Sequence, residues 1–399
     1  MLRTPRRILS VLTGPEVVRP PGLQTDEGRS ASRLELFFDL AFFLVVAELA
    51  TAFREDVTLH GLAVFAGLFT TVWWSWVSST VYANRFDSDD AVFRLLKLAG
   101  MAAVIGLAAT ATEATGDRTA LFAWCSVVLR GVLLLQYLRV HRHVPEARAV
   151  TRPYLAATCV GGLLWAASTV LPAPACFVLW GLAVVVEVAV PLVATRSAAD
   201  APLHLEHLPE RFALFVILVL GEAVAAVARG VHDAGWTAAA VAVAAVSFVL
   251  TAGLWWSHFD LAGVGARELL SRAGVVHGTA HEVYVLGLLP LCLALALVGT
   301  GIELAVLESG QGDVPLGTRL LLAGGVALYL ASVAVRNSAM TGHWRSGWWW
   351  PMAAAALAGL DVLLELPALA VVGALAALLA AVVVTGIVQR APVEQPAAA

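Results

Sequence analysis

The sequence predicts an all-α polytopic membrane protein with about 12 transmembrane helices. It is 60% hydrophobic and only 14% charged, whereas a soluble domain carries about 25% charged residues. Apolar runs of about 20 residues, the length that crosses a bilayer as a helix, recur from Leu34 to Val388. The formal net charge of −4 argues against a nucleic acid as partner. We therefore expect the lipid bilayer to be the main surrounding of the chain.

Twelve apolar segments can be placed in order along the chain. Their predicted bounds are 34–53, 60–82, 91–113, 119–140, 152–171, 175–195, 210–229, 236–258, 277–300, 317–335, 347–366 and 368–388. The short gaps after residues 171 and 366 leave open whether the segments beside them are separate spans or helical hairpins. The run ILSVLTG after Arg7 is too short for a cleavable signal peptide and meets Pro15.

These segments give the chain five predicted parts. They are a polar cytoplasmic N-terminal tail (1–33), a first six-helix half (34–195), a cytoplasmic linker (196–209), a second six-helix half (210–388) and a cytoplasmic C-terminal tail (389–399). Only four of the 25 Lys and Arg residues fall in outward segments, namely Arg54, Arg118, Arg229 and Arg319. Because cytoplasmic loops carry an excess of Lys and Arg, both termini are predicted to be cytoplasmic.

The two predicted halves share a pattern of residues. Glu48 lies late in the first span, and the second span contains Trp-Trp-Ser-Trp at 73–76. In the second half, Glu222 lies in the seventh span, and the eighth ends in Trp-Trp-Ser-His at 255–258. An offset of six spans gives both copies the same orientation, so the pattern favours a parallel 6+6 repeat. Chance recurrence among apolar helices is the alternative.

The first span carries three carboxylates, Glu35, Asp39 and Glu48. Charged residues inside a membrane span are costly and usually face the protein interior or a cavity. On a helix, Glu35 and Asp39 share one face, whereas Glu48 lies nearly opposite Asp39 and about 20 Å further along the axis than Glu35. We interpret Glu35 as an interfacial residue, Asp39 as a buried ion-paired group and Glu48 as the counterpart of Glu222.

The loop NRFDSDD at 84–90 brings charge to the predicted cytoplasmic side. Arg85 in this loop, and Arg94 with Lys97 on one face of the third span, are candidate partners for Asp39. The alternative is that Arg94 and Lys97 are ordinary interface anchors. Three acids of the loop can cap the third span, an interpretation that we prefer to metal binding. They are Asp87, Asp89 and Asp90.

Glu222 is the most unusual residue of the second half. It lies about 18 Å into the seventh span, beside Gly221, and no sequence neighbour neutralises it. It is either a coupling carboxylate or a protonated carboxyl that hydrogen-bonds across helices. Arg130 and Glu187 also lie in mid-span with opposite signs, and we predict that they form a structural pair.

Other chemistry has weak support. His204 and His207 lack the spacing of a zinc motif, and no nucleotide-binding or catalytic motif is present, so we expect no metal and no cofactor. His277 and His281, beside Glu282, either line a cavity or mark the wet end of the ninth span. The tryptophan-rich stretches are predicted to form aromatic belts at the membrane interfaces. These stretches are Trp73, Trp74 and Trp76, then Trp255 and Trp256, and finally 348–350.

Four motifs in order resemble the bacterial low temperature requirement A (LtrA) family. They are ELFFDLAFFLVVAELA, the WW…YANRFDSDD segment, HLPERFALFVILVLGEAV and WWSHFD. The resemblance implies a polytopic bacterial inner-membrane protein whose molecular activity is poorly defined. The motif positions carried over are Glu35, Phe37, Phe38, Asp39, Arg85, Phe86, Asp87, Asp90, His207, Glu210, Arg211, Gly221 and Glu222. One departure lies in the ninth span, where Leu288 stands at the position expected to hold a histidine.

We expect a secondary transporter, with proton coupling, for an unidentified small solute or ion. In this hypothesis Glu48, Glu222 and Asp39 are the proton-coupling or substrate residues, and a cytoplasmic gate is formed by charged residues near the inner face. The gate residues are Glu35, Arg85, Asp87, Asp90, Arg94, His207, Glu210 and Arg211. Two alternatives stay open. One is a cation channel of two six-helix repeats, and the other is a membrane-embedded enzyme that acts on lipid through His277, His281 and Glu282.

Overall fold

The computed structural model describes residues 18–24, 32–194, 207–262, 278–341 and 349–390. Almost all of these residues are helical, which confirms the all-α prediction. Within these ranges the paired strands are two residues long, β1 (Gly22–Leu23) and β2 (Phe86–Asp87), and they pair antiparallel. Residues 1–17, 195–206 and 391–399, which include parts of the predicted tails and linker, lie outside the described residues.

The described helices follow the predicted segments closely. The first six are α2 (Arg33–Glu55), α3 (Leu59–Arg85), α4 (Ala91–Thr110), α5 (Thr119–His143), α6 (Arg148–Ser168) and α7 (Ala175–Ala194). The rest are α8 (His207–Asp233), α9 (Ala238–Trp256), α11 (Gly278–Leu307), α12 (Leu316–Arg319), α13 (Gly325–Thr341), α14 (Trp349–Asp361) and α15 (Ala368–Arg390). The π-helical segment η5 (Leu320–Gly324) joins α12 to α13, so the described ranges hold twelve continuous helices. A second π-helical segment, η4 (Ser257–Ala262), extends α9.

Nine of the described helices are long and apolar enough to cross a membrane. Two others, α7 and α14, contain apolar stretches of only 10–17 residues, Ala175–Val190 and Met352–Asp361. The remaining helix, α6, carries arginines in its first turns and a proline at Pro153. The prediction of twelve helices is therefore confirmed, whereas the structure supports nine spans among the residues that it describes.

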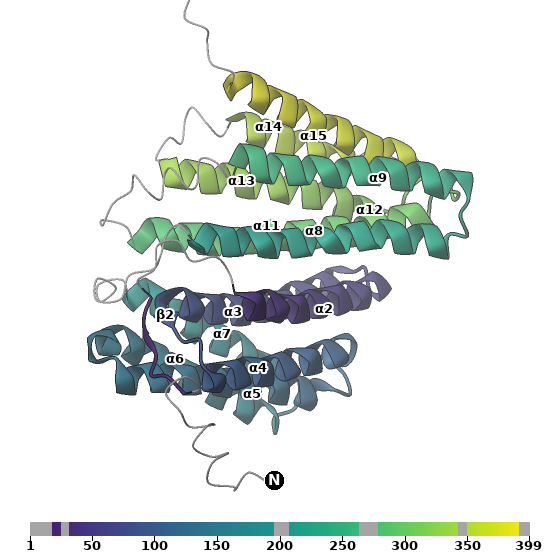
Figure 1. Ribbon diagram of the computed structural model, residues 1–399. Coiled ribbons are helices and arrows are strands. Elements are labelled where there is room, and N and C mark those ends of the chain that lie inside the picture. The colour runs from purple at the N-terminus through teal and green to yellow at the C-terminus, as the bar shows by residue number, and fades with distance from the viewer. Residues whose placement is uncertain (1–17, 25–31, 195–206, 263–277, 342–348, 391–399) are drawn as a thin grey trace, which may run out of the picture. The chain divides into compact units, whose positions relative to one another are not determined.

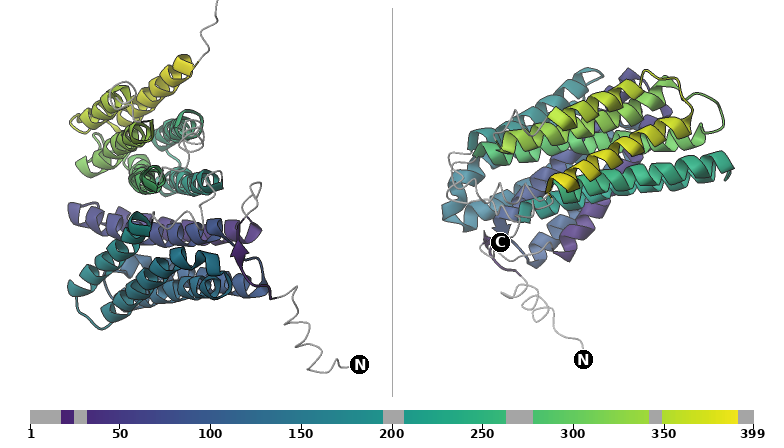
Figure 2. Two further views of the ribbon diagram at one scale, coloured as in Figure 1. Left: turned by 90° about the vertical axis from the view of Figure 1, so that its left-hand side faces the viewer. Right: turned by 90° about the horizontal axis from the view of Figure 1, so that it is seen from above.

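The chain divides into two compact units, Met1–Phe215 and Val216–Ala399, and the division falls inside α8. In the first unit α4, α5, α6 and α7 pack against one another in chain order, while α2 packs on α3 and α4. In the second unit α11, α13, α14 and α15 pack in chain order, and α9 packs on α15. Figures 1 and 2 show the helices of each unit lying side by side and roughly aligned.

Local capping signals explain where several helices begin. Ser32 and Glu35 form a capping box at the start of α2, in which each side chain accepts a hydrogen bond from the other's backbone N–H. Thr58 caps α3, and Asp90 caps α4. Such side chains satisfy backbone N–H groups that have no partner within the helix. Glu35 therefore has a defined structural role in addition to its charge.

Candidate functional site

A cluster of buried charges in the first unit centres on Asp39 of α2. Its Oδ1 accepts a hydrogen bond from Nε1 of Trp76 at 2.8 Å and another from Nη2 of Arg211 at 3.1 Å. Trp76 belongs to α3 and Arg211 to the first turns of α8, and all three side chains are buried. One carboxylate oxygen thus ties three helices together.

Glu35 and Lys97 complete this cluster. Glu35 Oε2 lies 3.5 Å from Nη1 of Arg211. The Lys97 ammonium is 4.3 Å from the ring centroid of Phe38, and its charge acts on both carboxylates. Two acids and two bases leave no formal net charge, so burial of the group is tolerable. We call Glu35, Asp39, Lys97 and Arg211 the neutral cluster.

The structure corrects the predicted partners of Asp39. Arg94 lies on the surface, where its Nε is 3.0 Å from Asp89 Oδ1. The Arg85 guanidinium instead lies 5.1 Å from the ring centroid of Tyr154. The arginine that reaches Asp39 is 172 positions away in sequence, at the start of α8. Glu35 lies in the first turn of α2 and is likewise buried beside that arginine, so its side chain is not open to water as an interfacial residue would be.

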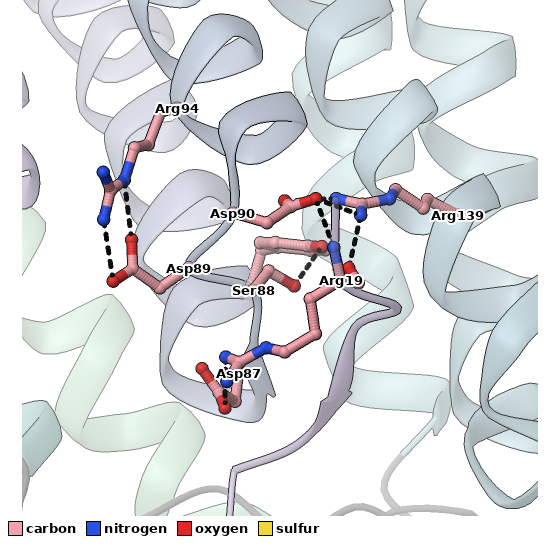
Figure 3. A network of polar contacts seen from close by, with 8 residues as sticks. Arg19, Asp87, Ser88, Asp89, Asp90, Arg94 and Arg139 are labelled. Atoms are coloured by element: carbon pink, nitrogen blue, oxygen red, sulfur yellow. Dashed lines mark hydrogen bonds and ion pairs between the residues drawn. The ribbon is translucent and has the colours of Figure 1, made fainter. Parts of the chain in front are cut away.

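The loop between α3 and α4 holds a second polar network, drawn in Figure 3. Asp90 accepts a bond from the backbone N–H of Phe93 at 3.0 Å, and this confirms its predicted capping role. It also accepts bonds of 2.7 and 2.6 Å from both terminal nitrogens of Arg139. Burial acts to raise the pKa of Asp90, but the bonds from Arg139 and Phe93 outweigh it and hold the pKa below 3.8. Asp87 pairs with Arg19 at 2.9 Å instead of capping the helix.

Residues 18–24 form a strap across this loop, although the sequence predicts only a polar tail here. The backbone N–H of Arg19 donates to Asp90 Oδ2 at 3.2 Å, and its carbonyl accepts from Arg139 Nη2 at 2.6 Å. The pairing of β1 with β2 follows directly, with Gly22 opposite Asp87 and Leu23 opposite Phe86. Backbone bonds carry no residue signature, so the pattern of side chains could not have revealed the strap.

The second unit contains a cluster with unequal charge. Glu222 of α8 and Glu303 of α11 both contact the terminal Nη2 of Arg229, and the distance to Glu303 Oε2 is 2.8 Å. Both carboxylates are buried. Two carboxylates share one guanidinium, so the group carries a formal charge of −1 when all three are ionised. We call Glu222, Arg229 and Glu303 the acidic cluster.

The acidic cluster overturns the expectation that no sequence neighbour neutralises Glu222. Arg229 lies seven positions later, which places it on the same helix face two turns away. That spacing was the available signal, and the topology had assigned Arg229 to an outer loop. A Cβ on Gly230 would lie 2.9 Å from Val306 Cβ, so this glycine permits the close approach of α8 to α11.

The predicted pairing of Arg130 with Glu187 is confirmed. Arg130 Nε donates to Glu187 Oε1 at 2.9 Å and Nη2 to Oε2 at 3.3 Å, and both side chains are buried. The Arg130 guanidinium also lies 4.9 Å from the ring centroid of Trp165. Gly161 of α6 makes room for the pair, since a Cβ there would lie 2.2 Å from Glu187 Oε1. This is a structural tie of α5, α6 and α7.

The structure leaves other candidates apart from these clusters. Glu48 is half-buried and has no hydrogen-bond or ion-pair partner among the described residues. Glu210 is half-buried in the first turn of α8. The side chains of His207, His281 and Glu282 lie outside the described part of the structure, as does all of His277. In the described ranges, no three His, Cys, Asp or Glu side chains gather as a metal site would require.

The tryptophan-rich stretches differ from a uniform aromatic belt. Trp73 and Trp76 are fully buried, and Trp74 is nearly so. Trp76 packs between Phe212 and Phe215, with ring centroids 5.0 and 4.4 Å away. The belt prediction is therefore wrong for α3, because the neighbouring helices cover this stretch. Trp255 and Trp256 of α9 are half-exposed, in line with that prediction, while the side chains at 348–350 are outside the described residues.

Large apolar side chains cover the outer faces of the helices. Examples on candidate spans with about half or more of their surface exposed are Leu95, Leu135, Val249 and Val388. Exposed leucine and valine on helices long enough to span a bilayer imply contact with lipid. The lipid bilayer is accordingly a partner of this chain.

Comparisons with known proteins agree with the membrane architecture. A protein of Rhizobium meliloti (strain 1021), described as uncharacterized protein RA0937, is 28% identical over 319 residues, which cover 77% of this chain and 76% of that protein. No solved structure matches the chain. The family described as bacterial low temperature requirement A protein (LtrA) matches residues 30–384. The chain therefore belongs to the LtrA family and is a multi-pass membrane protein of a bacterial family.

Proposed function

We propose that this protein is a secondary transporter that couples movement of a small solute or ion to protons. The observation that carries the proposal is the acidic cluster, in which the buried Glu222 and Glu303 share the guanidinium of Arg229. The protein is proposed to lie in the bacterial inner membrane. Both termini are proposed to be cytoplasmic, because most Lys and Arg residues fall in the segments that lie on the same side as the termini.

The charge of the acidic cluster gives the coupling its physical basis. Two buried carboxylates beside one half-exposed guanidinium carry an excess of negative charge, which is costly in a membrane protein, and binding one proton to either carboxylate removes that excess. The cluster can therefore exist in a proton-loaded neutral form and a proton-free anionic form. The neutral cluster and the Arg130–Glu187 pair have equal numbers of acids and bases, so neither requires a proton to balance its charge.

The neutral cluster is proposed as the cytoplasmic gate. Its Arg211 lies on the same helix as Glu222, about 16 Å away along the axis of α8. A shift of α8 on loading of the acidic cluster would strain the hydrogen bond from Arg211 to Asp39 and the ion pair of Arg211 with Glu35. Asp39 acts in this scheme as the gate carboxylate, and Arg85 and Arg94 do not take part in that ion pair.

We also propose a parallel 6+6 duplication. Its support is the order of neighbours within each unit, since four consecutive helices pack in chain order in both. The contact of α3 with α7 in the first unit has its counterpart in the contact of α9 with α15. In this alignment Glu48 corresponds to Glu222. Glu48 is half-buried and has no ion-pair partner among the described residues.

Proton flux in reconstituted vesicles tests the proposal. The protein is placed in liposomes of phosphatidylethanolamine and phosphatidylglycerol that enclose the pH dye pyranine, and candidate amino acids, sugars, carboxylates and monovalent cations are added outside one at a time. A coupled solute changes the internal pH in wild type but not in Glu222→Gln. The matched control is Glu113→Gln, which alters an exposed pair with Arg118. Unchanged coupled flux in Glu222→Gln would refute the coupling role.

A cation channel is the second candidate, and the same observation favours it. Two carboxylates on one guanidinium also attract a monovalent cation, as acidic rings do in channels. Planar-bilayer recordings separate the two functions. Unitary currents that disappear in Glu222→Gln would favour the channel, whereas solute-dependent proton flux without unitary currents would favour the transporter.

A further inference from the structure

Arg85, the last residue of α3, is a buried cation with no ion pair to another residue in the described part of the chain. Its side chain is 6% exposed, and its Nε and Nη1 atoms are buried with no hydrogen-bond acceptor among the described residues. Its carbonyl accepts a bond from the backbone N–H of Gln24, but this engages the main chain alone. The side chain contacts the face of Tyr154, 5.1 Å from the ring centroid.

Other buried or partly buried arginines of the first unit show what Arg85 lacks. Arg130 contacts Glu187, Arg211 contacts Asp39, and Arg139 contacts Asp90, each within 3.1 Å. A guanidinium stays protonated in proteins, so its positive charge cannot be removed by loss of a proton. Stacking on an aromatic ring offsets only part of the cost of taking this charge out of water. The Arg85 guanidinium therefore has unused capacity to bind an anion.

A second unpaired donor lies in the same region. The hydroxyl of Tyr137 on α5 is fully buried and has no hydrogen-bond partner among the described residues. The Tyr137 ring stacks on Tyr154 with centroids 5.3 Å apart, and the charge of Arg85 acts on its hydroxyl. The exposed arginines Arg148 and Arg152 shortly precede Tyr154 at the start of α6 and add positive charge there. The unpartnered groups of Arg85 and Tyr137 are both hydrogen-bond donors, which is the reverse of a cation site.

We propose that Arg85 and the Tyr137 hydroxyl bind a phosphate group. Arginine is suited to the oxygens of phosphate, which accept several charge-assisted hydrogen bonds at once. Arg85 is also the final residue of a candidate membrane span, at the depth where the phosphates of lipid headgroups lie. The phosphate belongs either to a lipid headgroup or to a small soluble anion, and both would meet the same donors.

Two binding measurements on the full-length protein in detergent separate these sources. Isothermal titration calorimetry uses inorganic phosphate as the probe. Native mass spectrometry compares phosphatidylglycerol with a diacylglycerol of the same acyl chains, which lacks the phosphate. Wild type is expected to bind at least one phosphate probe, and Arg85→Gln to bind it about 10- to 100-fold more weakly because a charged hydrogen bond is lost. Binding of inorganic phosphate identifies a soluble anion, and selective binding of phosphatidylglycerol identifies a headgroup.

Matched variants guard against a loss of fold. Arg94→Gln changes an exposed arginine that already has its carboxylate, Asp89, so it should bind the probes as wild type does. Tyr137→Phe keeps the stacked ring and removes the hydroxyl alone, so it is expected to weaken binding about 5-fold even if Arg85→Gln does not fold. The proposal is overturned if wild type binds neither phosphate probe, or if the well-folded variants at Arg85 and Tyr137 bind as wild type does.

Discussion

Two glutamate-to-glutamine substitutions should differ sharply in their effect on stability, although both remove a buried carboxylate from an arginine. Glu187→Gln leaves Arg130 without a counter-ion, because their pair is one to one and both side chains are buried. Glu222→Gln leaves Arg229 still bonded to Glu303 at 2.8 Å and removes the excess negative charge of the acidic cluster. The balance of charge in each cluster, rather than burial alone, decides the outcome.

The magnitudes follow from that balance. Removal of one partner from a buried pair costs about 3–5 kcal/mol, and each kcal/mol shifts the melting temperature of a unit of 150–250 residues by about 2–4 °C. Glu187→Gln should therefore lower the apparent melting temperature by about 6–20 °C. Arg229 is 38% exposed and keeps one carboxylate, so Glu222→Gln should change stability by about 1 kcal/mol or less in either direction.

Thermal unfolding of the detergent-solubilised variants, followed by intrinsic tryptophan fluorescence, measures both shifts. The exposed control Glu113→Gln should stay close to wild type. An apolar double variant, Arg130→Met with Glu187→Leu, should recover most of the loss seen in Glu187→Gln, because it leaves no buried charge. Equal losses in Glu187→Gln and Glu222→Gln would show that the charge balance does not control the stability of these clusters.

Three further predictions concern single contacts. Gly161→Ala places a methyl group within 2.2 Å of Glu187 Oε1, so it should lower the melting temperature almost as far as loss of that glutamate does. Asp90→Asn should destabilise the protein at neutral pH. The pKa of Asp90 is lower in the folded than in the unfolded protein, so the ionised carboxylate stabilises the fold at pH values above the unfolded pKa of about 3.8. That stabilisation is lost as the pH falls through the folded pKa. Wild type and Asp90→Asn should thus differ in melting temperature at pH 7 and converge as the pH falls below 3.8, and a constant difference would contradict this. Trp76→Phe keeps an aromatic ring but removes the donor to Asp39, and unfolding in denaturant should show a loss of about 1–2 kcal/mol.

The twelve helices could be predicted from sequence because hydropathy is a local property. Even the short segments at 175–195 and 347–366 fall on helices, α7 and α14. The pairing of Arg130 with Glu187 was also accessible, because two isolated opposite charges in mid-span have few other partners. The depth of each residue in its predicted span and the sign of its charge were enough to predict this pair.

The partners of Asp39 were beyond the same reasoning. Arg85 and Arg94 are closer in sequence, but Arg211, at the start of α8 and within the first unit, is brought to Asp39 only by the fold of that unit. The pattern of apolar and polar residues along one helix shows which of its faces is buried, but not which neighbouring helix packs on that face. The tryptophans of α3 show the same limit, since a run of indoles predicts an interface unless the packing is known to bury it.

The long separation between Asp39 and Arg211 has a consequence for how the protein is made. The arginine is synthesised 172 residues after the carboxylate, which is about 9–34 s at the usual 5–20 residues per second. During that interval α2 has already left the ribosome, and Asp39 still lacks the arginine that pairs with it. Trp76 is made only 37 residues after Asp39 and is the first partner available to it. The indole can therefore hold the carboxylate during biogenesis, until the start of α8 brings the arginine that completes the cluster.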